Sequence, residues 1–134
     1  MTIDLEEKIS SIAVEAMLHE VAATPKPGLV DRRNSGAHRD MDIFTFLSSA
    51  STLHPFFTKM ALEGSQFDGE NYTTLMKNIR PIGIEAEKSM LRATSGINTH
   101  KGLIFSLGIL ASATACVMKK GIDLTAETIC TIAA

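Results

Sequence analysis

The chain has 134 residues, of which 45% are hydrophobic, and its formal net charge is −2. This length and apolar content suffice for one domain with a buried core, and they argue against a disordered protein. The balanced charge, the lack of a basic run and an aromatic content of only 5% give no support for binding to nucleic acids. The acidic N-terminus lacks the pattern of a secretory signal, so we expect a cytoplasmic protein.

Apolar residues at helical spacing predict a first helix over residues 4–23, which must end before Pro25 because the residue preceding proline disfavours the helical region. Its polar residues Glu15, His19 and Glu20 are expected to form a solvated face, and Glu20 lies nearest to the loop that follows. Further helices are predicted over residues 41–62, 71–92 and 102–118, and a last helix is expected to begin after Asp123.

Several local features refine these predicted helices. Pro55 is expected to kink or divide the second helix, and Pro81 with Gly83 should bend or split the third. Asn71 or Thr73 is a candidate N-cap for the third helix and Thr125 for the last one. The uncharged segment 102–118 is near the lower length limit of a membrane span. Its small and polar residues favour instead a central helix that is buried on all sides. Cys116 and Cys130 are expected to be buried free thiols.

No alternating pattern predicts a strand, so the expected fold is all-α: one multi-helix bundle over residues 1–134. The last predicted helix stops at Ala134 without a stop signal, which suggests the N-terminal portion of a larger all-helical domain.

Two polar stretches, Thr24–Asp42 and Ser95–Gly102, interrupt the helices. Long polar loops between helices commonly serve binding or catalysis, and we expect these two to meet in one site for an anionic ligand. Arg, Lys and glycine residues that suit phosphate oxygens include Lys26, Gly28, Arg32, Arg33, Arg39 and Lys101. From the residues alone, a solvated loop with ordinary surface ion pairs is a slightly better interpretation.

Acidic and imidazole groups lie in the same stretches. Asp31, Asp40 and Asp42 are candidate ligands of Mg²⁺, although Asp40 and Asp42 could equally cap the next helix. His38 and His100 could donate to phosphate or exchange protons near neutral pH.

Three runs, PKPGLVD, NSGAHRDM and GINTHKG, occur in the order found in one enzyme family. In these runs the chain closely resembles the triphosphoribosyl-dephospho-CoA synthases, the CitG/MdcB-type enzymes. The resemblance implies an all-helical transferase that joins ATP to 3′-dephospho-CoA and releases adenine. The product is the precursor of the prosthetic group of the acyl carrier protein of citrate lyase or malonate decarboxylase.

The resemblance also implies roles for individual residues, with Mg²⁺ as the expected metal. Phosphates would be held by Lys26, Arg32, Arg33, His100 and Lys101, with Gly28 allowing close backbone approach. Asp31 and Asp40 would bind the metal or act on the sugar, and His38 is a third catalytic candidate. Asn34, His38 and Asn98 would position ribose or base.

Members of this family are considerably longer than this chain, so the chain is expected to hold part of a site. It would then be inactive alone, or it would self-associate as a homo-oligomer to cover exposed apolar faces. Two other functions remain as alternatives: a helical metal-dependent hydrolase of a phosphorylated or ADP-ribosylated substrate, and a non-catalytic helical interaction fragment. No nucleic-acid or membrane partner is expected.

Overall fold

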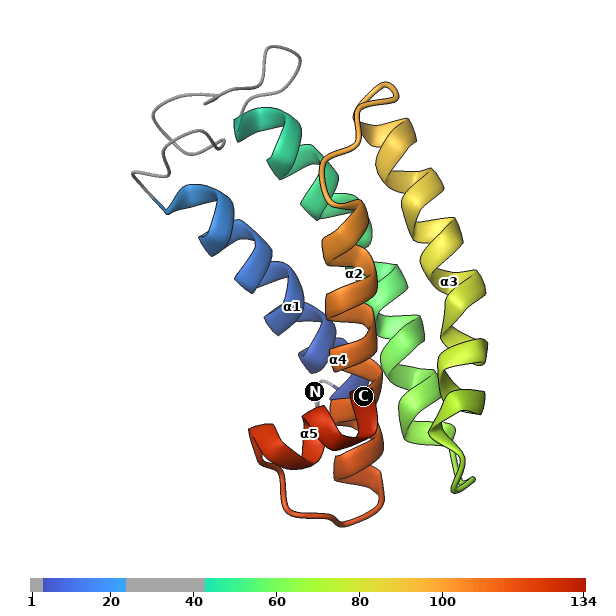
Figure 1. The fold of residues 1–134 in the computed structure, drawn as a ribbon. Coiled ribbons are helices and arrows are strands. Elements are labelled where there is room, and N and C mark those ends of the chain that lie inside the picture. Colours follow the sequence, from blue (N-terminus) through green and yellow to red (C-terminus); the bar gives the residue numbers. More distant parts are fainter. Residues whose placement is uncertain (1–3, 24–42) are drawn as a thin grey trace.

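A computed structural model describes residues 4–23 and 43–134 of the chain. The described residues form helices and no strand, which confirms the all-α prediction. The helices form an elongated bundle in which α5 lies across one end (Figure 1). They are α1 (Leu5–Ala22), α2 (Ile43–Gln66), α3 (Tyr72–Ala93), α4 (Lys101–Lys119) and α5 (Ala126–Ala133).

The helix ends are fixed by side chains that satisfy free backbone amides. Asn71 Oδ1 accepts from the amide of Thr73 at 3.1 Å, which confirms Asn71 as the N-cap of α3. Thr125 caps α5, as the sequence predicted, and it forms a capping box with Thr128. After α4, Gly121 has a φ of 70° in the left-handed region, a conformation that glycine adopts readily just past the end of a helix.

The two internal prolines do not divide their helices, so that alternative is wrong. Residues 43–66 form one helix through Pro55, and residues 72–93 form another through Pro81. The physical reason is burial: Leu53 and Phe57, on either side of Pro55, are completely buried in the core. Packing of this kind outweighs the one hydrogen bond that a proline removes. α2 also continues to Gln66, beyond the predicted end at residue 62.

α4 is the central helix and contacts each of the other four helices. Its second half is buried on nearly every side, but Ser106 and Leu110 are exposed on its first half, so the expected burial on all sides is only partly right. α4 is long and apolar enough to cross a membrane by length and composition, a property that core helices share. Cys116 is buried as expected, whereas Cys130 is exposed, which corrects the prediction for that thiol.

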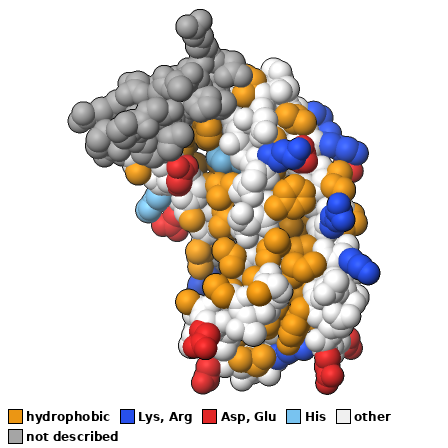
Figure 2. All heavy atoms as spheres, viewed as in Figure 1, with side chains coloured by type: hydrophobic (Ala, Val, Ile, Leu, Met, Phe, Trp, Pro, Cys, Tyr) orange, Lys and Arg blue, Asp and Glu red, His pale blue; other side chains and the backbone are white. Residues whose placement is uncertain are grey.

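One end of the bundle concerns function most directly. The end of α1, the start of α2, the end of α3 and the start of α4 all lie there (Figure 1). Figure 2 shows hydrophobic side chains along the visible face over α4, with Lys and Arg side chains gathered along the edge formed by α3.

Candidate functional site

The structure describes the second polar stretch but not the first. Asn98, His100 and Lys101 belong to the described residues, and they lie at the start of α4. The other predicted site residues lie outside the described residues: Lys26, Gly28, Asp31, Arg32, Arg33, Asn34, His38, Arg39, Asp40 and Asp42. The predicted meeting of the two stretches therefore stays a prediction.

The connection from α3 to α4 has a tightly defined backbone. Ser95 and Gly96 have φ values of 56° and 92°, and the amide of Gly96 donates to the carbonyl of Leu91 at 2.7 Å. A serine in the left-handed region is uncommon and costs conformational energy, which the surrounding contacts must offset. The buried Thr94 has its Oγ1 2.9 Å from the carbonyl of Met90 and 2.5 Å from that of Ile97.

A polar cleft of about 250 Å³ lies beside this connection. Residues at the start of α2 form one wall and the connection forms the other: Phe44, Thr45, Ser48, Ala93, Thr94, Ser95 and Ile97. Backbone and hydroxyl groups dominate its polar surface, so it suits a neutral polar group of a ligand better than a charged one.

Asn98 supports the first turn of α4. Its Oδ1 accepts from the amide of Lys101 at 3.2 Å, so this oxygen satisfies one of the free amides at the helix start. The side chain of Lys101 is 57% exposed and forms an ion pair with Glu87 of α3, with 3.4 Å between Nζ and Oε1. Lys101 thus sits at the positive end of the helix dipole, where a phosphate group is favoured.

His100 is the most enclosed member of the predicted site, with only 4% of its surface exposed. Its Nδ1 lies 2.6 Å from Ser49 Oγ, and its ring meets that of Phe46 edge-on, with centroids 4.9 Å apart. Its backbone amide donates to Met90 Sδ at 3.1 Å. Contacts from α2 and α3 therefore fix both the ring and the backbone of His100.

Burial lowers the pKa of His100 from 6.5 to about 4, and the negative charge of Glu20 on α1 opposes part of this change. The imidazole is therefore neutral at physiological pH. A phosphate at this position would meet an N–H donor rather than a positive charge, which leaves Lys101 as the cation at the start of α4. His100 Nε2 is buried and has no hydrogen-bond partner among the described residues.

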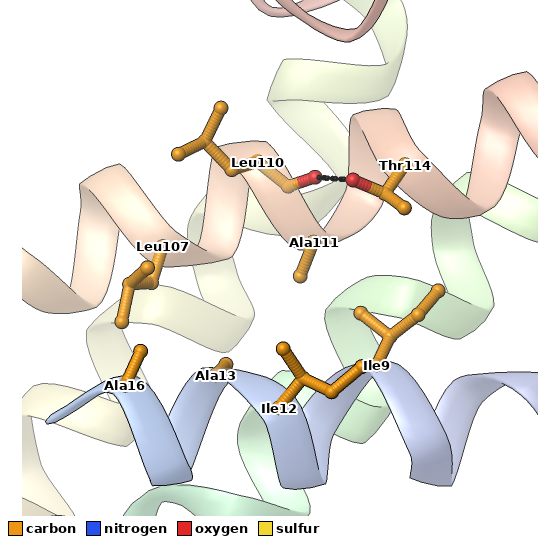
Figure 3. Close-up of a pocket in the computed structure, with 8 residues that line it drawn as sticks. All are labelled: Ile9, Ile12, Ala13, Ala16, Leu107, Leu110, Ala111 and Thr114. Atoms are coloured by element: carbon orange, nitrogen blue, oxygen red, sulfur yellow. Dashed lines mark hydrogen bonds between the residues drawn. The ribbon is translucent and has the colours of Figure 1, made fainter. Parts of the chain in front are cut away.

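A second concave surface lies between α1 and α4 (Figure 3). This groove encloses about 180 Å³, and its lining is almost entirely apolar: Ile9, Ile12, Ala13, Ala16, Leu107, Leu110, Ala111 and Thr114. Ile12 is 58% exposed and Leu110 is 39% exposed. With no charged group in its lining, the groove does not suit phosphate and is distinct from the site at the start of α4.

Within residues 4–23 and 43–134, no three His, Cys, Asp or Glu side chains lie close enough to hold a metal ion. The predicted metal ligands Asp31 and Asp40 lie outside these residues.

Sequence reasoning did not find Ser49 and Phe46, which contact His100, or Thr99, whose hydroxyl is hydrogen-bonded to Ser49. The only available signal was a serine in the apolar stretch 43–61, where a polar side chain facing the core needs a partner. Without the helix packing, nothing in the sequence pairs Ser49 with a residue about 50 positions away.

Residues 6–133 match the protein family described as CitG: ATP:dephospho-CoA triphosphoribosyl transferase. The chain belongs to this family. The match covers nearly the whole chain, in agreement with the three runs that carried the resemblance.

Two of the curated relatives described below are named as synthases of this kind. The chain is 46% identical over 125 residues to the probable 2-(5''-triphosphoribosyl)-3'-dephosphocoenzyme-A synthase of Streptococcus mutans, covering 91% of this chain and 42% of the relative. It is 42% identical over 126 residues to the protein of the same name from Vibrio cholerae, covering 94% and 40%. It is 44% identical over 117 residues to Protein CitXG of Leuconostoc mesenteroides, covering 87% and 25%.

The chain thus spans between a quarter and about two fifths of the length of these relatives. No solved structure matches it.

Proposed function

We propose that this chain forms part of a triphosphoribosyl-dephospho-CoA synthase and contributes the end of the helical bundle that holds ATP. The observation that carries the proposal is the family match over residues 6–133. The described structure supports it with Lys101 and the free amides at the start of α4, beside the enclosed imidazole of His100.

The proposed reaction transfers the triphosphoribosyl group of ATP to the ribose 2′-hydroxyl of 3′-dephospho-CoA. The glycosidic bond between ribose C1′ and adenine breaks, and its electron pair leaves with adenine, which takes up a proton. The 2′-oxygen then bonds to C1′, and the hydroxyl proton passes to a base. Positive charge develops on the ribose during this exchange, so a carboxylate nearby stabilises the transition state.

Within this scheme, Lys101 and the amides of α4 are assigned to phosphate oxygens, and neutral His100 donates a hydrogen bond. Lys26, Gly28, Arg32 and Arg33 keep their predicted role in binding the triphosphate. Asp31, Asp40 and His38 remain the catalytic candidates, and Asn34 and Asn98 remain candidates for holding ribose or base.

Mg²⁺ is part of the proposal, with Asp31 and Asp40 as its ligands, because carboxylate oxygens are ligands that Mg²⁺ prefers. A bound Mg²⁺ would neutralise part of the triphosphate charge. The acyl carrier protein of citrate lyase or malonate decarboxylase is the proposed destination of the product. Because ATP is abundant in the cytoplasm, we also propose a cytoplasmic location.

The groove between α1 and α4 supports the proposed self-association. Its exposed residues Ile12 and Leu110 are large and apolar, and contact with a second copy would remove them from water. Light scattering of the purified chain measures this directly, and Leu110→Glu is expected to shift any dimer to monomer.

Chromatography of reaction mixtures tests the proposed activity. The chain is incubated with ATP alone and with ATP plus 3′-dephospho-CoA, and adenine is quantified in both. Adenine release that depends on 3′-dephospho-CoA supports the transferase. Release without the acceptor, or loss of phosphate instead, indicates the hydrolase. No binding of ATP in calorimetry would favour the interaction fragment and contradict the proposal.

A further inference from the structure

A chain of hydrogen bonds leads from the α3–α4 connection through α2 to His100. Thr99 Oγ1 donates to Ser49 Oγ at 2.5 Å, and Ser49 Oγ lies 2.6 Å from His100 Nδ1. Ser49 and His100 are both buried, with 0% and 4% of their surfaces exposed. Water therefore does not compete for the buried bond between Ser49 and His100, whereas the bond from the partly exposed Thr99 is part-buried.

Counting the protons along this series of hydrogen bonds assigns the tautomer of His100. A serine hydroxyl has one proton to donate. Ser49 Oγ accepts from Thr99, so its own proton is directed to its other neighbour, His100 Nδ1. Nδ1 is then the acceptor, and in a neutral imidazole the single ring proton must be on Nε2.

The opposite nitrogen is placed to donate. His100 Nε2 is buried and has no hydrogen-bond partner among the described residues. A buried donor without an acceptor is destabilising, so the site favours a ligand that brings an acceptor oxygen. Phe46 packs edge-on against the ring at an interplanar angle of 85°, which limits rotation of the imidazole away from this orientation.

We propose that Ser49 and Thr99 are positioning residues that hold His100 as the neutral Nε2–H tautomer, so that Nε2 donates to a phosphate oxygen of the bound nucleotide. The donor role rests on the proposed function, whereas the tautomer assignment does not. The low pKa of His100 agrees with a ring that stays neutral at pH 7. The arrangement provides a directed hydrogen bond without placing a second full charge beside Lys101.

Nitrogen NMR of chain labelled with ¹⁵N-histidine tests the tautomer in the ligand-free protein. The chain has four histidines, and His100→Gln identifies the signals of His100 by their loss. At pH 7 we expect a protonated Nε2 and an unprotonated, hydrogen-bonded Nδ1. A protonated Nδ1 in the wild-type protein overturns the proposal.

Variants of Ser49 and Thr99 separate a positioning role from a general effect on the structure. Ser49→Ala is expected to move the Nδ1 signal towards that of a nitrogen without a hydrogen bond. Thr99→Val should move it in the same direction by a smaller amount, and Thr99→Ser should restore it. Ser51→Ala is the matched control because Ser51 lies on the exposed side of α2, and among the described residues its hydroxyl donates to the carbonyl of Ser48, at 2.9 Å. Equal Nδ1 signals in all variants overturn the proposal.

Titration with ATP tests the donor role. ATP is expected to shift the Nε2 signal of His100, and Ser49→Ala should weaken ATP binding about five-fold in calorimetry, the effect of one hydrogen bond. The same titration with 3′-dephospho-CoA shows which phosphates reach the ring. If ATP binds with unchanged affinity to Ser49→Ala and leaves Nε2 unshifted, the inference is wrong and the proposed function stands. If ATP does not bind at all, the proposed function and the donor role fail together.

Discussion

Gly64 on α2 lies where this helix approaches α4 closely, and its replacement by alanine should separate the two helices. A Cβ at this position would overlap the carbonyl oxygen of Ser112 on α4 and lie 2.7 Å and 2.9 Å from its C and Cα atoms. Ordinary contacts begin near 3.4 Å, and all three neighbours are backbone atoms that cannot rotate away. Overpacking of this kind costs about 3 kcal/mol, whereas replacing a helical glycine gains about 1 kcal/mol, so we expect a net loss of about 2 kcal/mol.

Gly108 provides a matched control on α4. A Cβ there would meet the end of the Met60 side chain, with Cε at 3.0 Å and Sδ closer. Methionine has three rotatable bonds and can move aside, so Gly108→Ala should change stability by less than about 1 kcal/mol. Urea denaturation followed by circular dichroism measures both variants. Equal stabilities of Gly64→Ala and Gly108→Ala would show that α2 and α4 do not approach as described.

Other expectations concern protonation, thiol reactivity and the ion pair at the site. Between pH 6.5 and about 4, His100 is protonated in the unfolded protein but stays neutral in the folded protein. The free energy of unfolding should therefore fall by about 3 kcal/mol as the pH is lowered across this window. If urea denaturation shows that the free energy of unfolding changes equally with pH in wild type and His100→Gln, this expectation is contradicted. Burial raises the pKa of the Cys116 thiol, so Ellman's reagent should label only Cys130 in the native protein and both thiols in denaturant. Rapid labelling of both thiols in the native protein would contradict the burial of Cys116. Glu87→Gln should alter stability by less than about 0.5 kcal/mol, because its partner Lys101 is largely exposed, yet calorimetry should show tighter ATP binding once the lysine is free. Weaker binding would mean that Glu87 orients Lys101 for the ligand.

The all-α fold and the order of the helices could be predicted because they depend on local patterns. Apolar spacing, the caps at Asn71 and Thr125 and the glycine at position 121 act within a few residues of one another. The division of the second helix at Pro55, one of the two predicted alternatives, was wrong for the opposite reason. The proline penalty is local, but the burial of Leu53 and Phe57 that offsets it comes from contacts with other helices.

The same limit applies to the candidate site. His100 and Lys101 were found because they lie in a polar run with glycines, a pattern visible along the chain. The neutral state of His100 was not predictable, because it follows from burial between α2 and α3. Its partner Ser49 lies on another helix, and only the packing of α2 against α4 brings the two together.

The most direct measurement is an amide NMR titration of the ¹⁵N-labelled chain with ATP. If the start of α4 holds the triphosphate, the largest changes among the described residues should fall on residues 98–102 and on Ser49, with little change in α5 or along the groove between α1 and α4. Large changes confined to the groove or to α5, with residues 98–102 unaffected, would contradict the assignment of ATP to this end of the bundle.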